Sequence, residues 1–241
     1  LHASDRPAGQ RLSGFDMMGA DAQAMQRDDF ANPARLRVRE GEALWSAFPA
    51  PGRPACAACH GAAPAGMKGV AARYPARRAG SATVIDLPER IRLCQSEQQQ
   101  GSAQPRDSAP LLALEAYVAL QSREMPIEPP SARGLDDAVA RGAQLYTRRM
   151  GQLDLSCAQC HSQNWGRMLG GTRIPQAHPT GYPVFRMEWQ AVGSLQRRIR
   201  NCLTGVRAQP FAPGAADLID LEAFLKQRAA AMPMDAPGVR P

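Results

Sequence analysis

The sequence of 241 residues predicts a mainly α-helical protein built from two similar units. The first observation is an internal repeat, in which the same landmarks recur in the same order about 100 residues apart. The second is that apolar residues recur at helical spacing, whereas the alternating pattern of strands is scarce. The third is the length, which suffices for two domains of roughly 100 residues each.

The repeat is centred on two copies of one cysteine-containing segment, at residues 56–60 and 157–161, which lie 101 positions apart. Matching residues before each copy are Gly41 with Gly142, Leu44 with Leu145, and Trp45 with Tyr146. Matching segments after each copy, at offsets of 107 or 108, are 90–94 with 198–202, 114–117 with 221–224, and Met125-Pro126 with Met232-Pro233. The chain therefore divides into an N-terminal extension (1–35), a first unit (36–128) and a second unit (129–241).

The elements follow the same plan in both units. Helices are expected over 34–48 and 135–148, each running into its cysteine segment. Leu111, Leu114 and Val118 have the spacing of an amphipathic helix, for which Ser108 is a plausible N-cap. Leu218, Leu221 and Leu225 repeat that spacing. The extension is predicted to be rich in loops, and a proline-rich linker is expected over 126–134.

The net charge of +7 comes almost entirely from arginine, because Lys68 and Lys226 are the only lysines. The guanidinium group is well suited to oxyanions such as carboxylate or sulfonate. No zinc finger or aromatic-studded basic strand supports binding to nucleic acid. No apolar run is long enough to span a bilayer. A small anion or an acidic protein partner is the better expectation.

Each cysteine segment has the pattern Cys-x-x-Cys-His, the attachment signature of a c-type haem. The thiols of Cys56 and Cys59, and of Cys157 and Cys160, bond the two haem vinyl groups; the adjacent His60 or His161 ligates the iron. The fold class is therefore mainly α, with two tandem cytochrome c-like domains and two covalently attached haem c groups. The alternatives are redox disulfides, or Cys₃His zinc sites completed by Cys94 and Cys202.

Counting the donors narrows the choice of the second axial ligand. Besides the two motif histidines the chain has only His2, near the terminus, and His178, which is expected to be structural. Cys94 and Cys202 occupy equivalent places in the two units, so His/Cys ligation at both haems is the economical interpretation. Met125 and Met232 are also equivalent and keep His/Met ligation open. A Cys94–Cys202 disulfide is a further alternative.

An arginine precedes each of these cysteines by four residues, Arg90 before Cys94 and Arg198 before Cys202. On a helix the arginine and the cysteine share one face. Arg200 and Arg207 also flank Cys202. The functional interpretation is a cationic pocket that holds an oxyanion against a reactive sulfur; the alternative is a clamp for the haem propionates.

Several segments resemble the di-haem form of the SoxA subunit of SoxAX cytochromes. They are residues 27–32, 146–161, 178–183 and 197–211. The similarity is most specific in the second unit, through Cys202.

The resemblance implies an L-cysteine S-thiosulfotransferase, in which thiosulfate is coupled oxidatively to a cysteine of a SoxYZ-like carrier. Two electrons pass through haem to a SoxX-like mono-haem subunit and a soluble cytochrome c. Cys202, which can carry a persulfide, is implied as the reactive sulfur and Arg198 as the residue that binds the anion; the first haem is an accessory centre. The alternatives are a di-haem thiosulfate dehydrogenase that forms tetrathionate and a pure electron-transfer cytochrome.

The expected location is the periplasm, since covalent haem attachment normally takes place outside the bacterial cytoplasm. The chain starts without the charged and apolar regions of a signal peptide, so such a segment is expected to have been removed.

Overall fold

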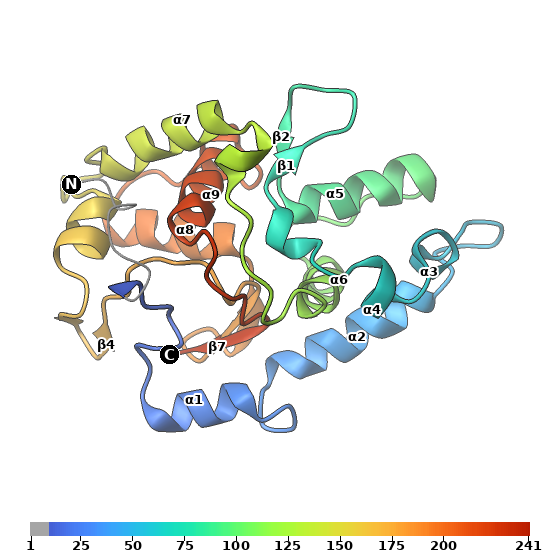
Figure 1. The fold of residues 1–241 in the computed structure, drawn as a ribbon, viewed down its shortest axis with the longest axis horizontal. Coiled ribbons are helices and arrows are strands. Elements are labelled where there is room, and N and C mark those ends of the chain that lie inside the picture. The colour runs from blue at the N-terminus through green and yellow to red at the C-terminus, as the bar shows by residue number, and fades with distance from the viewer. Residues whose placement is uncertain (1–9) are drawn as a thin grey trace.

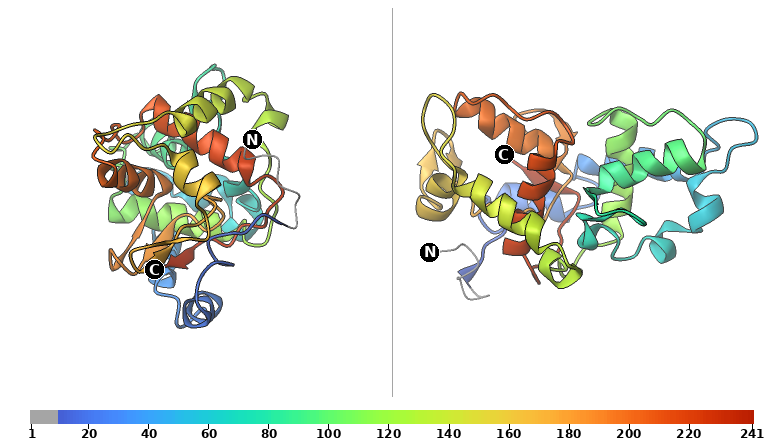
Figure 2. Two further views of the ribbon diagram at one scale, coloured as in Figure 1. Left: turned by 90° about the vertical axis from the view of Figure 1, so that its left-hand side faces the viewer. Right: turned by 90° about the horizontal axis from the view of Figure 1, so that it is seen from above.

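The computed structural model describes residues 10–241, and helices dominate it. The α-helices are α1 (Ala20–Arg27), α2 (Ala34–Ser46), α3 (Cys56–His60), α4 (Ala63–Gly66), α5 (Leu87–Leu93), α6 (Ala109–Leu120), α7 (Asp136–Thr147), α8 (Leu195–Gly205) and α9 (Ala216–Arg228). Two groups of helices lie side by side in Figures 1 and 2, α2 to α6 in one group and α7 to α9 in the other. The mainly α fold with two similar units is confirmed; the boundaries at 35/36 and 128/129 stay predictions.

Shorter helical turns connect these helices. They are η2 (Ala71–Arg73), η3 (Cys94–Gln98), η4 (Pro130–Arg133) and η5 (Gln159–Gln163). The strands are short as well: β1 (Ala76–Arg77), β2 (Val84–Ile85), β3 (Met168–Leu169), β4 (Thr172–Arg173), β5 (Val184–Arg186), β6 (Ala191–Gly193) and β7 (Gly238–Arg240). The largest sheet has three strands in the order β6-β5-β7, with β5 antiparallel to β6 and parallel to β7.

Each unit is organised around one close crossing of two helices, α2 on α6 and α7 on α9. Gly41 and Gly142 lie at these crossings. A Cβ atom on Gly41 would lie 2.0 Å from the carbonyl oxygen of Ala113, and one on Gly142 would lie 2.0 Å from that of Asp220. Only glycine permits this approach of two backbones, which explains why the repeat contains it twice.

Helix α6 was expected to be amphipathic, but it is buried on all sides over residues 111–119. One side packs against α2 and α5, and the opposite side faces the second unit. Helix α9 is buried in a similar way and encloses even Glu222 and Lys226. The predicted amphipathic character is therefore wrong for both helices, since the contact between the units covers the face that would otherwise meet solvent.

Ser108 occupies the N-cap position of α6, but its Oγ makes no capping bond and is buried without a hydrogen-bond partner. By contrast, the N-cap residues of α5 and α8 do make capping hydrogen bonds. Asp86 accepts a hydrogen bond from the Glu89 N–H at 2.9 Å, and Ser194 accepts one from the Arg197 N–H at 3.1 Å. The two caps are themselves related by the repeat.

The two units meet through equivalent segments. The Ile127 N–H donates to the Met232 carbonyl at 2.9 Å, and the Met234 N–H donates to the Met125 carbonyl at 2.9 Å. Pro126 and Pro233 thus face each other in an antiparallel bridge. A contact between matching segments of two similar units is of the kind that relates the subunits of a symmetric dimer.

The N-terminal extension packs on the second unit. The Leu12 N–H donates to Gln176 Oε1 at 2.9 Å, and the Val239 N–H donates to Gln26 Oε1 at 2.8 Å. His178 is buried with its Nδ1 2.8 Å from the Leu12 carbonyl, in agreement with a structural role. The extension contains α1 in addition to the expected loops; His2 lies outside the described residues.

Across residues 10–241, no helix is both long enough and apolar enough to cross a membrane.

Candidate functional site

In the first unit, the cysteine motif forms α3 and opens onto a cavity of about 700 Å³. Cys56, Cys59 and His60 line the cavity together with Cys94, which η3 contributes. Cavities of about 300–1,000 Å³ are typical of sites for cofactors and other small molecules. The two thiols and the two predicted axial ligands of this unit therefore border one space that can accommodate a large cofactor.

The walls of this cavity fit a haem. Apolar side chains that line it are Met67, Val70, Leu87, Ile91, Leu114 and Val118, and the cationic ones are Arg73, Arg77, Arg90 and Arg133. Nε and Nη2 of Arg133 are buried without a hydrogen-bond partner. An apolar slot suits the flat macrocycle, and a propionate would satisfy these guanidinium nitrogens.

In the second unit, a backbone carbonyl contacts the ring of the motif histidine and fixes its orientation. His161 is half-buried, and its Nδ1 lies 2.7 Å from the carbonyl oxygen of Pro175. Such a bond fixes the tautomer and leaves Nε2 available for a metal. Burial, supported by the charges of Arg228 and Arg198 and opposed by the Pro175 bond, lowers the pKa of His161 to about 4. The imidazole is therefore neutral at pH 7, as a ligand must be.

The thiols of the second motif lie close to Cys202. Burial and then the neighbouring Cys202 raise the pKa of Cys157 to about 11, and the same two causes raise the pKa of Cys160. In the first unit, burial and then Cys94 raise the pKa of Cys56. The structure thus brings each downstream cysteine to the motif of its own unit, as the repeat predicts.

Arg198 and Cys202 lie one turn apart on α8, and both are half-buried. In the first unit, Arg90 on α5 partly offsets the rise that burial causes in the pKa of Cys94. Both arginines are therefore near the space between the motif and the downstream cysteine. The predicted cationic surroundings of the sulfur exist in both units.

Two alternatives do not fit the structure. All six cysteines lie in the described part of the chain and are free, so no disulfide joins Cys94 to Cys202. Within residues 10–241, no group of three or more His, Cys, Asp and Glu residues is arranged to hold a metal ion, which argues against Cys₃His zinc sites.

Met125 and Met232, the two methionines considered as haem ligands, lie at the contact between the units. Met125 and Met232 belong to the bridge between the units, and Met232 is buried among side chains of the first unit. Within the described residues, the lining of the first cavity includes Cys94 but not Met125. This arrangement favours cysteine over methionine opposite His60.

A tyrosine at each site was not predicted. Tyr74 and Tyr182 are related by the offset of 108 that also relates Arg90 to Arg198. Burial raises the pKa of each tyrosine, and the arginine of the same unit is the largest opposing influence. Each site is therefore a set of tyrosine, arginine and cysteine. The signal was present in the sequence, because Tyr-Pro occurs at both positions.

These features define a c-type cytochrome, a protein with covalently bound haem c, in which two similar helical units each present a Cys-x-x-Cys-His motif. A family model described as the SoxA/TsdA cytochrome c domain matches residues 40–127 and 141–234. The chain belongs to this family. The two matched segments contain one haem motif each.

Curated relatives agree with the SoxA resemblance. The L-cysteine S-thiosulfotransferase subunit SoxA of Rhodovulum sulfidophilum is 30% identical over 239 residues, which cover 99% of this chain and 83% of the relative. The subunit of the same name from Pseudaminobacter salicylatoxidans is 30% identical over 235 residues, covering 97% and 82%. The crystal structure of SoxXA from P. pantotrophus superimposes with a TM-score of 0.89 at 26% identity, covering 96% of this chain and 87% of that one.

Proposed function

We propose that this chain is the haem-carrying subunit of an L-cysteine S-thiosulfotransferase that couples thiosulfate to a cysteine of a SoxYZ-like carrier protein. The observation that carries the proposal is the position of Cys202. It lies beside the haem motif of the second unit and one helical turn after Arg198. This position supports the proposal, because it would put a sulfur, an anion-binding group and a haem electron acceptor in one place.

Two haem c groups are proposed, one in each unit. Cys56 and Cys59 would attach the first, and His60 and Cys94 would ligate its iron. Cys157 and Cys160 would attach the second, and His161 and Cys202 would ligate its iron. The large cavity supports the first assignment, and the proximity of Cys202 to both thiols of its motif supports the second.

Arg198 binds the substrate. Thiosulfate is a dianion, and a guanidinium group can orient its sulfonate oxygens through two parallel hydrogen bonds. Because the side chain is half-buried, these bonds are screened less than they would be at the surface.

Cys202 supplies the sulfur that takes part in exchange. In its persulfide form it offers an outer sulfur that reacts first with thiosulfate and then with the carrier thiol. The overall reaction joins the carrier thiol to thiosulfate through one new S–S bond and releases one proton and two electrons. When bound, the haems accept these electrons one at a time and pass them on.

The electron acceptors are proposed to be a SoxX-like mono-haem subunit and then a soluble cytochrome c. The SoxXA structure, whose SoxA chain has the fold of this protein, supports the first partner. Leu153, Met168 and Leu169 are exposed apolar side chains of the second unit, and the exposed fraction of Leu169 is 70%. They offer a surface on which a permanent subunit can pack.

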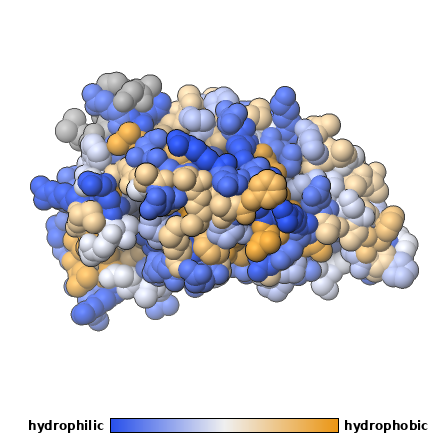
Figure 3. All heavy atoms as spheres, turned by 90° about the horizontal axis from the view of Figure 1, so that it is seen from below, coloured by the Kyte–Doolittle hydropathy of each residue, from blue (hydrophilic) through white to orange (hydrophobic). Residues whose placement is uncertain are grey.

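The face that carries α1 and α2 also exposes large apolar side chains. Figure 3 shows apolar residues interspersed with hydrophilic ones on this face. Leu36 lies on α2, and Phe30 and Phe48 lie just before and just after it, with exposed fractions of 63%, 94% and 74%. Exposed apolar side chains are thus present on both units, and the second unit is proposed for the permanent subunit because its haem is the one beside Cys202. The periplasm, where haem c is attached in bacteria, is the proposed location.

The test is an analysis of the products formed from thiosulfate with and without a carrier thiol, on protein whose intact mass shows how many haems are bound. We expect two haems and a thiosulfonate adduct that forms only when the carrier is present. Free tetrathionate in its absence would identify a thiosulfate dehydrogenase instead. No new sulfur product in either reaction would leave an electron-transfer cytochrome.

A further inference from the structure

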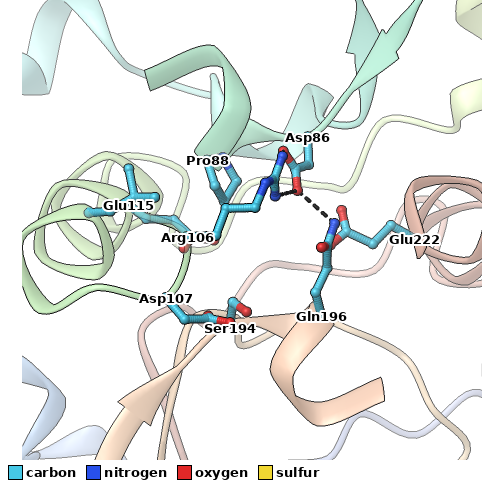
Figure 4. Close-up of a pocket in the computed structure, with 9 residues that line it drawn as sticks. Asp86, Pro88, Arg106, Asp107, Glu115, Ser194, Gln196 and Glu222 are labelled. Atoms are coloured by element: carbon cyan, nitrogen blue, oxygen red, sulfur yellow. Dashed lines mark hydrogen bonds and ion pairs between the residues drawn. The ribbon is translucent and has the colours of Figure 1, made fainter. Parts of the chain in front are cut away.

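The contact between the two units encloses a group of buried charged residues that the proposed function does not use. Glu115 on α6 and Glu222 on α9 are equivalent in the repeat, at an offset of 107. Their exposed fractions are 8% and 9%. Figure 4 shows the two side chains on opposite sides of one small pocket, with Asp86 and Arg106 between them.

The cations around this pocket do not balance the carboxylates. Arg106 donates to both carboxylate oxygens of Asp86, at 2.6 and 2.9 Å, and to Glu89 at 2.9 Å. Burial lowers the pKa of Arg106, but the bonds and charges of Asp86 and Glu89 together outweigh it and raise the pKa, so the charge of Arg106 is already compensated. Gln196 of α8 donates a further bond to Asp86 at 2.7 Å.

Lys226 is the cation left for the two glutamates. It is buried one turn after Glu222 on α9, and its Nζ donates to the carbonyl oxygen of Pro179 at 3.4 Å. Two buried carboxylates and one ammonium leave one negative charge in excess. An uncompensated charge is strongly disfavoured in a protein interior, so such a group takes up a proton instead.

The geometry indicates where that proton is bound. Oε2 of Glu115 is buried without a hydrogen-bond partner. Glu115 lines a cavity of about 10 Å³ that Glu222 and Ser194 also line. This volume is about that of one water molecule. A protonated carboxyl is a hydrogen-bond donor and can bond to a water in this space, whereas two carboxylates only accept.

We propose that the interface between the two haem units is a proton-binding site, formed by Glu115 and Glu222, which holds one proton at neutral pH. Release of that proton places two like charges on opposite walls of the cavity and weakens the contact between the units. The junction between the haem units is thus sensitive to pH, independently of the chemistry at Cys202.

The surrounding charges agree with this assignment. Burial raises the pKa of Glu115 to about 8, reinforced by Asp86 and Asp107 and opposed by Arg106 and Lys226. Burial also raises the pKa of Glu222, and Asp86 and Glu115 add to the effect.

The sign of the pH effect follows from linkage. Between about 4.5, where glutamate titrates in the unfolded chain, and about 8, the folded protein holds a proton that the unfolded chain has lost. The stability that this proton provides is complete below that window and decreases as the pH rises through it. Lys226 affects the folding stability in a different pH range, because burial lowers its pKa to about 8 from 10.5.

The test is to measure the unfolding equilibrium of the holoprotein by denaturant between about pH 5 and pH 9. The variants are Glu115→Gln and Glu222→Gln, and the control is Glu42→Gln at an exposed position of α2. For the wild type and the control, the release of this proton is expected to lower the folding equilibrium constant about tenfold for each pH unit between about 4.5 and about 8. At least one of the two interface variants is expected to lose that slope and to gain stability near pH 8.

A second measurement does not depend on the folding of any variant. In the infrared spectrum of the wild-type holoprotein, we expect the carbonyl band of a protonated carboxyl near pH 6 and its loss near pH 9. If the band is absent near pH 6, both glutamates are ionised and the proposal is wrong. It is also wrong if both interface variants keep the slope of the Glu42→Gln control.

Discussion

The two haem units share a core but differ in how their motifs are covered. In the first unit, His60 is exposed and borders a wide cavity. In the second, the segment between His161 and Tyr182 is seven residues longer than its counterpart between His60 and Tyr74. It contains the hairpin β3–β4 and the Pro175 carbonyl that contacts His161. The N-terminal extension packs over this side as well.

This difference between the units indicates that the repeated core and the inserted segments have separate roles. The helix-crossing glycines, the tyrosine–arginine–cysteine sets and the cysteine motifs are common to both units. Among the described residues, only the second unit has an inserted segment whose backbone carbonyl, that of Pro175, contacts the histidine of the motif. This division agrees with the proposal that the repeat binds the cofactor and that sulfur transfer takes place in the second unit.

The largest difference between the two units is expected when Cys202 and Cys94 are each replaced by serine. Cys202→Ser is expected to reduce formation of the thiosulfonate adduct by more than about 1,000-fold, because the exchanging sulfur is lost. Cys94→Ser replaces the proposed ligand of the first haem and is expected to cause a much smaller loss. Product analysis on protein with two bound haems makes the measurement. Equal losses in both variants would show that the units are not specialised.

The next largest effect concerns the two arginines. Arg198→Lys keeps a positive charge but removes the planar fork, so kcat/KM for thiosulfate is expected to fall by about 10- to 100-fold. Arg90→Lys is expected to shift the potential of the first haem and to affect kcat/KM less. Steady-state kinetics and a redox titration separate the two. A propionate clamp in both units would instead give two potential shifts with similar kinetic effects.

The helix crossings test what the units have in common. Gly142→Ala and Gly41→Ala are each expected to destabilise the protein by about 1–3 kcal/mol or more, because each new methyl group meets a backbone carbonyl. Thermal unfolding of the holoprotein provides the measurement. A clearly milder effect in one unit would show that its crossing can open, and that the repeat is less regular than the structure indicates.

The smallest effect concerns helix capping. Ser194→Ala is expected to cost about 1 kcal/mol, because the Arg197 N–H loses its acceptor. Ser108→Ala is expected to be neutral or slightly stabilising, because its Oγ is buried without a partner. Denaturant unfolding of both variants at one pH tests this difference. A substantial loss in Ser108→Ala would reveal a capping bond at α6 after all.

Much of the site could be predicted from the sequence, because haem attachment depends on local spacing. Cys-x-x-Cys-His places two thiols and an imidazole on one turn whatever surrounds them. The repeat then singled out Cys94 and Cys202 as the remaining equivalent cysteines, which the structure brings to their motifs. The helices around Leu114 and Leu221 were predictable from apolar spacing alone.

Tertiary structure decided what depends on contacts distant in sequence. The burial of α6 and α9 on all sides arises because the units pack on each other, and an apolar repeat of one helix does not contain that information. For the same reason, nothing in the sequence marks Glu115 and Glu222 as buried, whereas the contact between the units encloses both. The sequence by itself determined the two haem motifs and their candidate ligands; only the packing of the two units determined which charged groups are buried between them.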